Sequence, residues 1–347
     1  MMTRTNAVGL ALLTLAGCDH KQGAAPSAEG RAVIISYSAP MLLGGQGSLH
    51  QSLEKHAKEK GFQVITTTSS GDPQKQLEQI KNFIKLRVDA IVAVPEDSRG
   101  ICAAVEAARA AKIPFYTIDR APEGCKVNMV VLSDNHLAGQ QSAEAMVALL
   151  ERRYKEPKGI VLEIAGNMAQ NVAQLRGNGF REVIARHPGI KLVTKEGSWL
   201  ADKAEAILRE QLASTPDLDG IYLPSDAAYI ASTLKVLRET SRLKRRGEPG
   251  HIIITAVDGS AVGVQAIKDG YLDQTSAQPL PDFGIVADWI EQEMRGTPVS
   301  AGEVRREGAL WSPARVTMSA IGPTLMLPTT SVTETNMGDP RLWGNQP

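Results

Sequence analysis

Two opposite charges stand side by side at the end of a short apolar run, Ile113-Pro-Phe-Tyr-Thr-Ile-Asp-Arg-Ala-Pro122. The run predicts a buried strand that delivers Asp119 and Arg120 to its carboxyl end. Open α/β sheets bind ligands in the crevice outside the carboxyl ends of their strands, so this pair is placed to hold a polar molecule. A surface ion pair is the alternative interpretation.

Other hydrogen-bonding side chains follow predicted strands or open predicted loops in the same way. They are Arg176 in Arg176-Gly-Asn-Gly-Phe180, Trp199 after Lys195-Glu-Gly-Ser198, Ser225 and Asp226 after Gly220–Pro224, Asp258 after Ile252–Val257, and Gln278 after Leu272–Ala277. Carboxylates, amides and guanidinium groups bond hydroxyls, and an indole face suits the apolar face of a sugar ring. We therefore expect a site for a sugar or polyol.

Several of these residues also have a structural interpretation. Asp258 is a preferred type of helix cap, a role that is compatible with ligand contact. Ser225 and Asp226 fit turn chemistry equally well, Trp199 fits a hydrophobic core, and Arg176 fits a salt bridge on a helix.

The sequence lacks the enzyme motifs that a strand–helix alternation often carries. Gly45-Gln-Gly47 follows the first predicted strand, but Ser48-Leu-His50 lacks the third glycine of a dinucleotide fingerprint, and no acid ends the second strand. No Gly-x-Ser-x-Gly elbow, phosphate loop or His-Glu-x-x-His motif occurs. We expect no catalytic residue, no cofactor and no metal site, and predict that the protein is not an enzyme.

The bulk composition favours two domains without nucleic-acid affinity. At 347 residues the chain exceeds the length at which single cores stop growing. Lys plus Arg and Asp plus Glu both number 38, and the cluster Arg242-Leu-Lys-Arg-Arg246 suits a helix end. We expect no nucleic-acid partner and a monomeric protein.

The amino terminus predicts export. After Arg4, the run Thr5–Leu15 is too short to span a bilayer and is followed by Leu15-Ala-Gly-Cys18, which resembles a bacterial lipobox. We expect a signal peptide over residues 1–18, a lipidated Cys18 and a polar tether over 19–30, with cleavage at another point as the alternative. Asp19 resembles an inner-membrane retention signal if the host is Gram-negative. The protein would be periplasmic or extracytoplasmic, held at the membrane only by its lipid.

Two cysteines remain after such cleavage, Cys102 and Cys125. Both lie on the carboxyl edge of the predicted sheet, and an oxidising compartment permits them to pair. A disulfide and two separate thiols both remain open at this point.

Short apolar runs alternate with longer amphipathic ones from Arg31 onward, and the rhythm restarts after Leu132. The predicted strands before that point are 32–38, 62–68, 90–94, 113–118 and 128–132, and the predicted helices are 48–60, one starting at Asp72-Pro73, and 100–111. Such alternation is typical of parallel sheets with helices on both faces. We predict two doubly wound, Rossmann-like α/β lobes.

Five motifs in order are similar to those of the periplasmic sugar-binding proteins of the ribose-binding type, which feed ABC transporters. They are the strand ending in Asp119-Arg120, Ser133-Asp-Asn135, Arg176-Gly-Asn-Gly-Phe180, Val257-Asp-Gly259 and Ala277-Gln278. The resemblance covers about residues 31–295 and implies a type I periplasmic binding protein fold with a three-segment hinge.

The resemblance also implies domain limits and ligand contacts. The N-terminal lobe would hold residues 31–134 and 279–312 and the C-terminal lobe 135–278 and 323–347, with chain crossings near 135, 278 and 312–323. Sugar hydroxyls would bond Asp119, Arg120, Arg176, Asp258 and Gln278, with Asn135, Ser225 and Asp226 as further candidates, and Trp199 would stack on the ring. A monosaccharide or polyol would be captured between the lobes and delivered to an ABC-transporter permease.

Two departures from the family pattern bear on the ligand. The family carries an Asn and paired phenylalanines after the first strand, where this chain reads Ser38-Ala-Pro-Met-Leu-Leu-Gly-Gly-Gln-Gly47, and Ser225 replaces an Asn. A smaller, differently oriented or non-pyranose ligand therefore remains open.

Alternative functions share the fold. One is a receptor that presents a sugar or autoinducer to a chemoreceptor or sensor kinase, and another is an enzyme of unrecognised type. A sugar-responsive repressor would need a helix-turn-helix before residue 31, where the sequence predicts only a signal peptide and tether.

Overall fold

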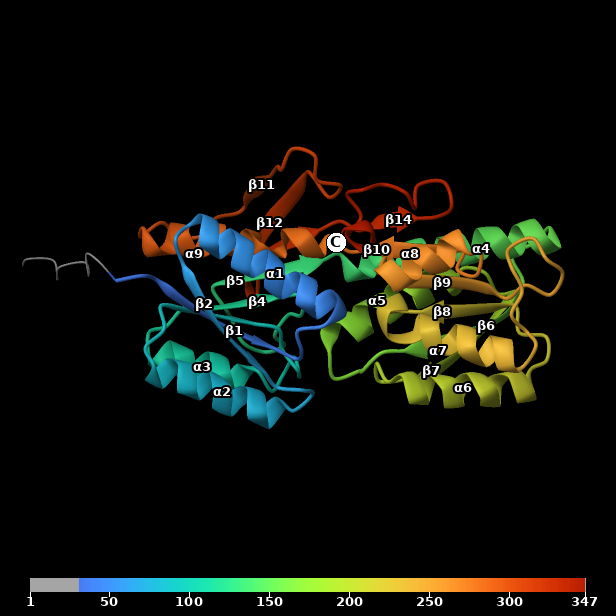
Figure 1. Ribbon diagram of the computed structural model, residues 1–347, viewed down its shortest axis with the longest axis horizontal. Helices are drawn as coiled ribbons and strands as arrows, with labels where there is room; N and C mark the ends of the chain where they lie inside the picture. The colour runs from blue at the N-terminus through green and yellow to red at the C-terminus, as the bar shows by residue number, and fades with distance from the viewer. Residues whose placement is uncertain (1–30, 347) are drawn as a thin grey trace, which may run out of the picture. The chain divides into compact units, whose positions relative to one another are not determined.

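The computed structural model describes residues 31–346, and Val33–Pro347 form one compact unit. The predicted signal peptide, the lipobox with Cys18 and the tether lie outside the described residues. Within the compact unit the chain builds two sheets, each with helices on both faces (Figure 1). The prediction of two doubly wound α/β lobes is confirmed.

The N-terminal lobe contains an eight-stranded sheet in the order β11-β12-β13-β5-β4-β3-β1-β2. Its strands are β1 (Ile34–Ala39), β2 (Gln63–Thr68), β3 (Ala90–Ala93), β4 (Phe115–Ile118), β5 (Met129–Ser133), β11 (Gly302–Val304), β12 (Ala314–Ser319) and β13 (Gly322–Leu327). Its helices are α1 (Gly44–Glu59), α2 (Pro73–Lys85), α3 (Cys102–Ala110), the 3-10 helix η1 (Leu280–Ile285) and α9 (Val286–Met294). The strands β1 to β5 are parallel, as crossover helices require.

The C-terminal lobe contains a six-stranded sheet in the order β14-β10-β9-β8-β6-β7. Its strands are β6 (Gly159–Ala165), β7 (Ile190–Glu196), β8 (Gly220–Leu223), β9 (Ile253–Asp258), β10 (Gln274–Ala277) and β14 (Thr330–Val332). Its helices are α4 (Asn135–Tyr154), α5 (Asn171–Ile184), α6 (Ala201–Ser214), α7 (Asp226–Glu239) and α8 (Ala261–Lys268), and the short 3-10 helix η2 (Trp343–Asn345) follows near the end of the chain. Among the residues described, no helix combines the length and apolarity that a membrane crossing needs.

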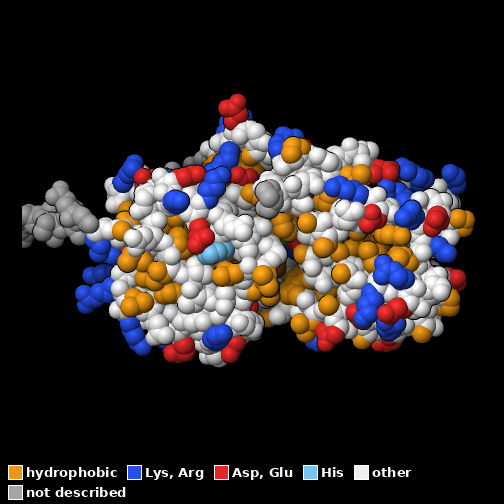
Figure 2. Space-filling view, viewed as in Figure 1, with side chains coloured by type: hydrophobic (Ala, Val, Ile, Leu, Met, Phe, Trp, Pro, Cys, Tyr) orange, Lys and Arg blue, Asp and Glu red, His pale blue; other side chains and the backbone are white. Residues whose placement is uncertain are grey.

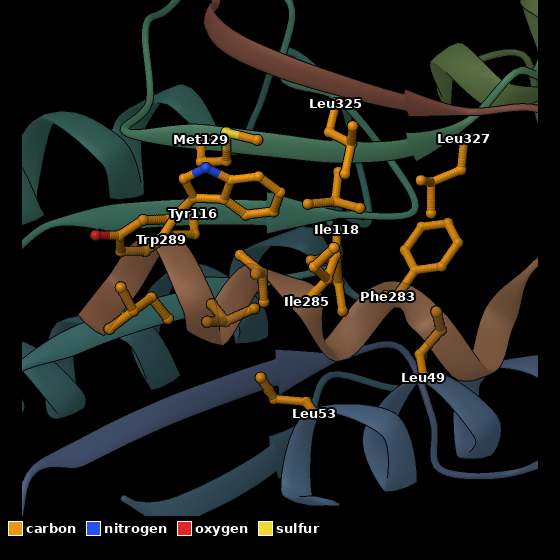
Figure 3. Close-up of a cluster of buried hydrophobic side chains, with 14 of the residues drawn as sticks. Leu49, Leu53, Tyr116, Ile118, Met129, Phe283, Ile285, Trp289, Leu325 and Leu327 are labelled. Carbon is orange, nitrogen blue, oxygen red and sulfur yellow. The ribbon is translucent and has the colours of Figure 1, made fainter. Parts of the chain in front are cut away.

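Each sheet is buried between two apolar layers. In the N-terminal lobe, Leu49 and Leu53 of α1 pack with Phe283 and Trp289 against one face of the sheet (Figure 3), while α2 and α3 cover the other face. In the C-terminal lobe, α6, α7 and α8 pack on one face and α4 and α5 on the other. Buried apolar strands that are covered on both faces are expected for a parallel sheet.

The third crossing of the chain lies later than the sequence predicts. The strands β12 and β13 extend the N-terminal sheet, where β13 pairs in parallel with β5, and only β14 joins the C-terminal sheet. The chain therefore crosses at Pro328 and Thr329 rather than within 312–323, and residues 323–327 belong to the N-terminal sheet. The physical reason is burial, because Leu325 and Leu327 are fully enclosed in the core of that lobe. The chain also passes between the two sheets next to Asn135, between β5 and α4, and next to Gln278, between β10 and η1.

The helices α4 and α5 approach so closely that their glycines are essential at the contact. A Cβ on Gly139 would lie 2.1 Å from the backbone oxygen of Arg176, and one on Gly179 would lie 2.1 Å from that of His136. The close packing of the two helices explains why the motif Arg176-Gly-Asn-Gly-Phe180 has a glycine at position 179. The same packing fixes the position of Arg176.

Candidate ligand-binding site

A cavity of about 640 Å³ is lined by residues of both lobes. Seven of the nine ligand-binding candidates line it, namely Asp119, Arg120, Arg176, Trp199, Ser225, Asp258 and Gln278. Hollows of about 610 Å³ and 750 Å³ also occur, but neither contains both Asp119 and Arg176 among its lining residues. The strand ends therefore meet in one space, as the rule for open α/β sheets requires.

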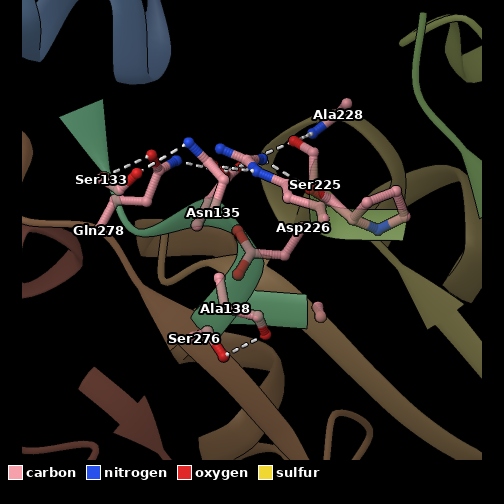
Figure 4. Close-up of polar contacts among 12 residues, drawn as sticks. Ser133, Asn135, Ala138, Ser225, Asp226, Ala228, Ser276 and Gln278 are labelled. Carbon is pink, nitrogen blue, oxygen red and sulfur yellow. Dashed lines mark hydrogen bonds and ion pairs between the residues drawn. The ribbon is translucent and has the colours of Figure 1, made fainter. Parts of the chain in front are cut away.

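Arg176 and Asp258 form the buried centre of a hydrogen-bond network. Nη1 of Arg176 donates to Oδ1 of Asp258 at 2.9 Å and to the Pro224 carbonyl at 2.6 Å. Nε2 of Gln278 donates to the same Asp258 oxygen at 2.6 Å, and the Ser225 hydroxyl donates to the other. Side chains from one helix and several strand ends thus hold one another in place (Figure 4).

Asn135 and Asp226 do not line the cavity but lie behind it. Oδ1 of Asn135 accepts a hydrogen bond from Nε of Arg176 at 2.7 Å, so this amide orients the guanidinium group. Both oxygens of Asp226 accept bonds from the protein, from the Gly259 and Ser260 amides and from the Thr275 hydroxyl. The geometry gives both residues a supporting position.

Serine side chains close to Asp226 and Asp258 cap the helices α7 and α8. The Ser225 hydroxyl accepts a bond from the Ala228 amide and caps α7, which is the turn chemistry that the sequence left open. Ser260, and not Asp258, caps α8 through the Gly263 amide. Asp258 is thereby left to pair with Arg176.

Burial changes the acidity of this network. Burial and the nearby charge of Asp258 raise the pKa of Asp226 to about 7, although hydrogen bonds from Ser260 and Thr275 oppose the shift. Burial also raises the pKa of Asp258, although the Arg176 guanidinium opposes the shift. These raised pKa values predict that the stability of the network depends on pH.

Asp119 and Arg120 face the cavity from the other lobe. Asp119 adopts a φ of 64°, a left-handed conformation that Asp tolerates better than most residues, and its Oδ2 accepts a bond from Gln46 at 2.9 Å. Arg120 donates to the Pro95 carbonyl at 3.0 Å, and burial lowers its pKa while the charges of Asp119 and Glu96 oppose this. The adjacent pair is therefore a partly buried wall of the cavity and not a surface ion pair.

Trp199 is held in the C-terminal lobe by close contacts with Tyr229 and Gly166. Its ring lies 6.1 Å from that of Tyr229, and a Cβ on Gly166 would lie 2.0 Å from the indole. Its Nε1 donates to Oε1 of Gln170 at 2.7 Å. Nε2 of Gln170 in turn donates at 3.1 Å to the carbonyl of Glu96 in the other lobe. Gln170 thus links the position of the indole to the contact between the lobes.

The residues beside Gln170 also join the two lobes. The Ser98 amide donates to the Ala169 carbonyl at 3.2 Å, and its hydroxyl accepts from the Asn171 amide at 3.1 Å. Oδ1 of Asn171 accepts from the Ala121 amide at 3.0 Å. We call the segment Ala169–Asn171 with these partners the interlobe clasp. Direct contacts between the lobes stabilise the arrangement that encloses the cavity.

Cys102 and Cys125 form a disulfide on the N-terminal lobe. Cys125 follows the loop that begins with Asp119 and Arg120, and Ala121 of that loop belongs to the clasp. The disulfide therefore ties the loop that carries these site residues to the start of α3.

Seven polar lining residues were not among the candidates from the sequence: Gln46, Ser70, Glu96, Asp97, Asn167, Gln170 and Ser198. Glu96 and Asp97 follow β3 and Asn167 follows β6, so the rule that found Asp119 would have found these three as well. Gln46 and Gln170 lie at the starts of helices without such a signal. The described residues contain no group of His, Cys, Asp and Glu placed to bind a metal ion.

Comparison with known proteins agrees with this geometry. Residues 46–291 match the model of the periplasmic binding protein domain family. The chain is 28% identical over 279 residues to the ribose import binding protein RbsB of Bacillus subtilis, covering 78% of this chain and 85% of the relative. It is 26% identical over 276 residues to the xylitol-binding protein of Mycolicibacterium smegmatis, covering 78% and 74%.

Solved structures share the fold. An ABC-transporter solute-binding protein of Bacillus halodurans with bound myo-inositol superposes with a TM-score of 0.76 at 19% identity, covering 91% of this chain and 99% of that one. One from Mycobacterium smegmatis with bound glycerol gives 0.73 at 24% identity, covering 88% and 96%. The family and these relatives are binding proteins of transport systems rather than enzymes. The chain belongs to the periplasmic binding protein domain family, within which it resembles the ribose-binding proteins.

Proposed function

We propose that this protein captures a monosaccharide or related polyol between its lobes and delivers it to an ABC-transporter permease. The observation that carries the proposal is the shared cavity, into which Asp119 and Arg120 come from one lobe and Arg176 and Asp258 from the other. The names of the curated relatives, which include ribose import and xylitol-binding proteins, support the ligand class and the delivery role.

The proposed ligand contacts use complementary chemistry. Carboxylate oxygens accept from sugar hydroxyls, and guanidinium and amide nitrogens donate to them. Trp199, whose ring is held by Gly166 and Tyr229, would stack on the apolar face of the ligand. Asn135 and Asp226 would act behind the site by holding Arg176 and the Gly259 loop.

Binding is proposed to close the lobes about the hinge at Asp134, Gln278 and Pro328. A ligand that contacts both lobes favours the closed form by its extra affinity for that form, and no bond needs to be made or broken. The interlobe clasp would then contribute to closure, since its hydrogen bonds form only when the lobes approach.

An extracytoplasmic location follows from family membership. We further propose that the chain is anchored by a lipid on Cys18 through the tether 19–30, on the strength of the motif Leu15-Ala-Gly-Cys18. Cys18→Ser should move the protein from the membrane fraction to the soluble extracytoplasmic fraction.

A thermal-shift screen of pentoses, hexoses and polyols tests ligand binding. A ligand at one hundred times its dissociation constant adds about 2.7 kcal/mol to the free energy of unfolding, which is readily measured. Arg120→Ala should abolish the shift, whereas Arg99→Ala, an exposed arginine paired with Glu123 outside the cavity, should keep it. A folded protein whose melting temperature no member of the panel raises would contradict the proposal.

A further inference from the structure

The outer part of the cavity is lined by large apolar side chains that remain exposed. Met41 and Leu43 in the β1–α1 loop are 51% and 77% exposed, and Leu200 before α6 is 48% exposed. All three line the cavity, and they come from both lobes. Scattered exposed apolar residues need no explanation, but a group around one opening marks a binding surface. Figure 2 shows hydrophobic side chains gathered around the hollow between the two halves.

The inner part of the cavity has the opposite character. Asp119, Arg176 and Asp258 are almost completely buried there. Much of their hydrogen-bonding capacity is already used within the protein, because Asp258 accepts from Arg176, Gln278 and Ser225. The inner part therefore suits a small hydroxylated group, while the outer part offers no comparable set of buried charges.

The volume is also larger than a lone sugar ring requires. Cavities of about 300–1,000 Å³ hold drug-sized ligands, and this cavity measures about 640 Å³. In the first loop, Pro40, Met41 and Leu43 stand where the resemblance led us to expect paired phenylalanines. Aliphatic side chains adapt to apolar groups of varied shape, whereas a ring pair selects a flat sugar face.

We propose that the ligand is a sugar or polyol that carries an apolar substituent, as an alkyl or aryl glycoside does. Its hydroxylated part occupies the inner end near Arg176 and Asp258, and its substituent packs against Met41, Leu43 and Leu200. This inference rests on the proposed sugar-binding function and specifies the substrate class of the same site. The substituent of the bound ligand then covers the exposed side chains of Leu43 and Leu200.

Matched ligand pairs test the inference by isothermal titration calorimetry. The probes are the methyl, n-butyl and phenyl glycosides, in both anomers, of ribose, xylose, glucose and galactose, together with the free sugars. Burial of about 60 Å² of apolar ligand surface corresponds to about a tenfold gain in affinity. We expect at least one sugar whose butyl or phenyl glycoside binds about tenfold or more tightly than its methyl glycoside.

In a double variant, Leu43→Ser with Leu200→Ser, the ratio between the affinities for the butyl or phenyl glycoside and for the methyl glycoside should fall to about one. Leu42→Ser is the matched control, because Leu42 is 38% exposed in the same loop but does not line the cavity. This control should keep the full preference for the larger substituent.

The outcomes separate this inference from the proposed function. Tight binding of free sugars with no gain from any substituent would overturn the inference and leave the sugar-binding function standing. An equal gain in the double variant and the parent protein would also overturn it, since the substituent would then bind elsewhere. Failure of every free sugar and every glycoside to bind the folded protein would contradict the proposed function itself.

Discussion

Nη1 of Arg176 lies 2.9 Å from Oδ1 of Asp258, and both side chains are buried. One residue comes from the helix α5 and the other from the end of the strand β9. Removing one partner of such a buried pair leaves the other charge buried without a counter-charge. This change lowers the free energy of unfolding by more than the intact pair contributes to it.

Asp258→Ala should therefore lower the free energy of unfolding by about 3 kcal/mol as well as abolish ligand binding. Asp258→Asn keeps the volume and one acceptor for Arg176, so its loss of stability should be smaller although ligand binding is still weakened. Urea denaturation of the three proteins without ligand measures the difference. Equal stability of the parent and Asp258→Ala would show that Arg176 does not depend on this carboxylate.

The buried Asp226 should make stability depend on pH. Burial, with the nearby charge of Asp258, raises the pKa of this residue to about 7. Between about pH 4 and pH 7 the folded protein thus retains a proton that the unfolded chain releases. Its contribution to stability is complete below this window, falls as pH rises through it, and is constant above it, with a slope of at most about 1.4 kcal/mol per pH unit.

Asp226→Asn removes the titrating group, so its stability should vary less than that of the parent between about pH 4 and pH 7. Denaturation of both proteins at several pH values across this window measures the two slopes. The variant also loses an acceptor for the Ser260 or Gly259 amide, so the comparison is of slopes and not of absolute stability. Parallel curves would assign the pH dependence to other groups.

Gln170 should couple closure of the lobes to the orientation of Trp199. Gln170→Glu retains an acceptor for the indole N–H but loses the donor to the Glu96 carbonyl, so it weakens the clasp selectively. We expect weaker binding of the best sugar from the screen and a more open form in small-angle scattering. Gln174→Glu in the helix α5, which begins directly after Gln170, is the control, because Gln174 does not line the cavity. An unchanged affinity in Gln170→Glu would remove the clasp from the binding mechanism.

The disulfide should stabilise the described fold measurably. Cys102 and Cys125 are 23 residues apart, and closing a loop of that length stabilises by about 3 kcal/mol in the chain-entropy account. Thermal unfolding with and without dithiothreitol should differ for the parent protein. The double variant Cys102→Ser with Cys125→Ser should melt at the temperature of the reduced parent. Its melting temperature should not change when dithiothreitol is added.

The sequence by itself determined the architecture and much of the candidate site. Alternating apolar and amphipathic runs specify a parallel sheet with helices on both faces, and residues directly after buried strands must lie at one edge of it. Asp119, Arg120, Ser225, Asp258 and Gln278 were found by that rule, and all of them line the cavity. This inference is local, because strand direction alone places the end of each strand.

Only the tertiary structure decided which polar groups face the cavity and which lie behind it. Asn135 and Asp226 follow predicted strands, as several residues that line the cavity do. Their side chains, however, accept hydrogen bonds from Arg176 and from the Gly259 amide. Gln170 is part of the site only because one lobe packs against the other. The strand β13 joined the N-terminal sheet because Leu325 and Leu327 complete its core, a long-range contact that no local pattern encodes.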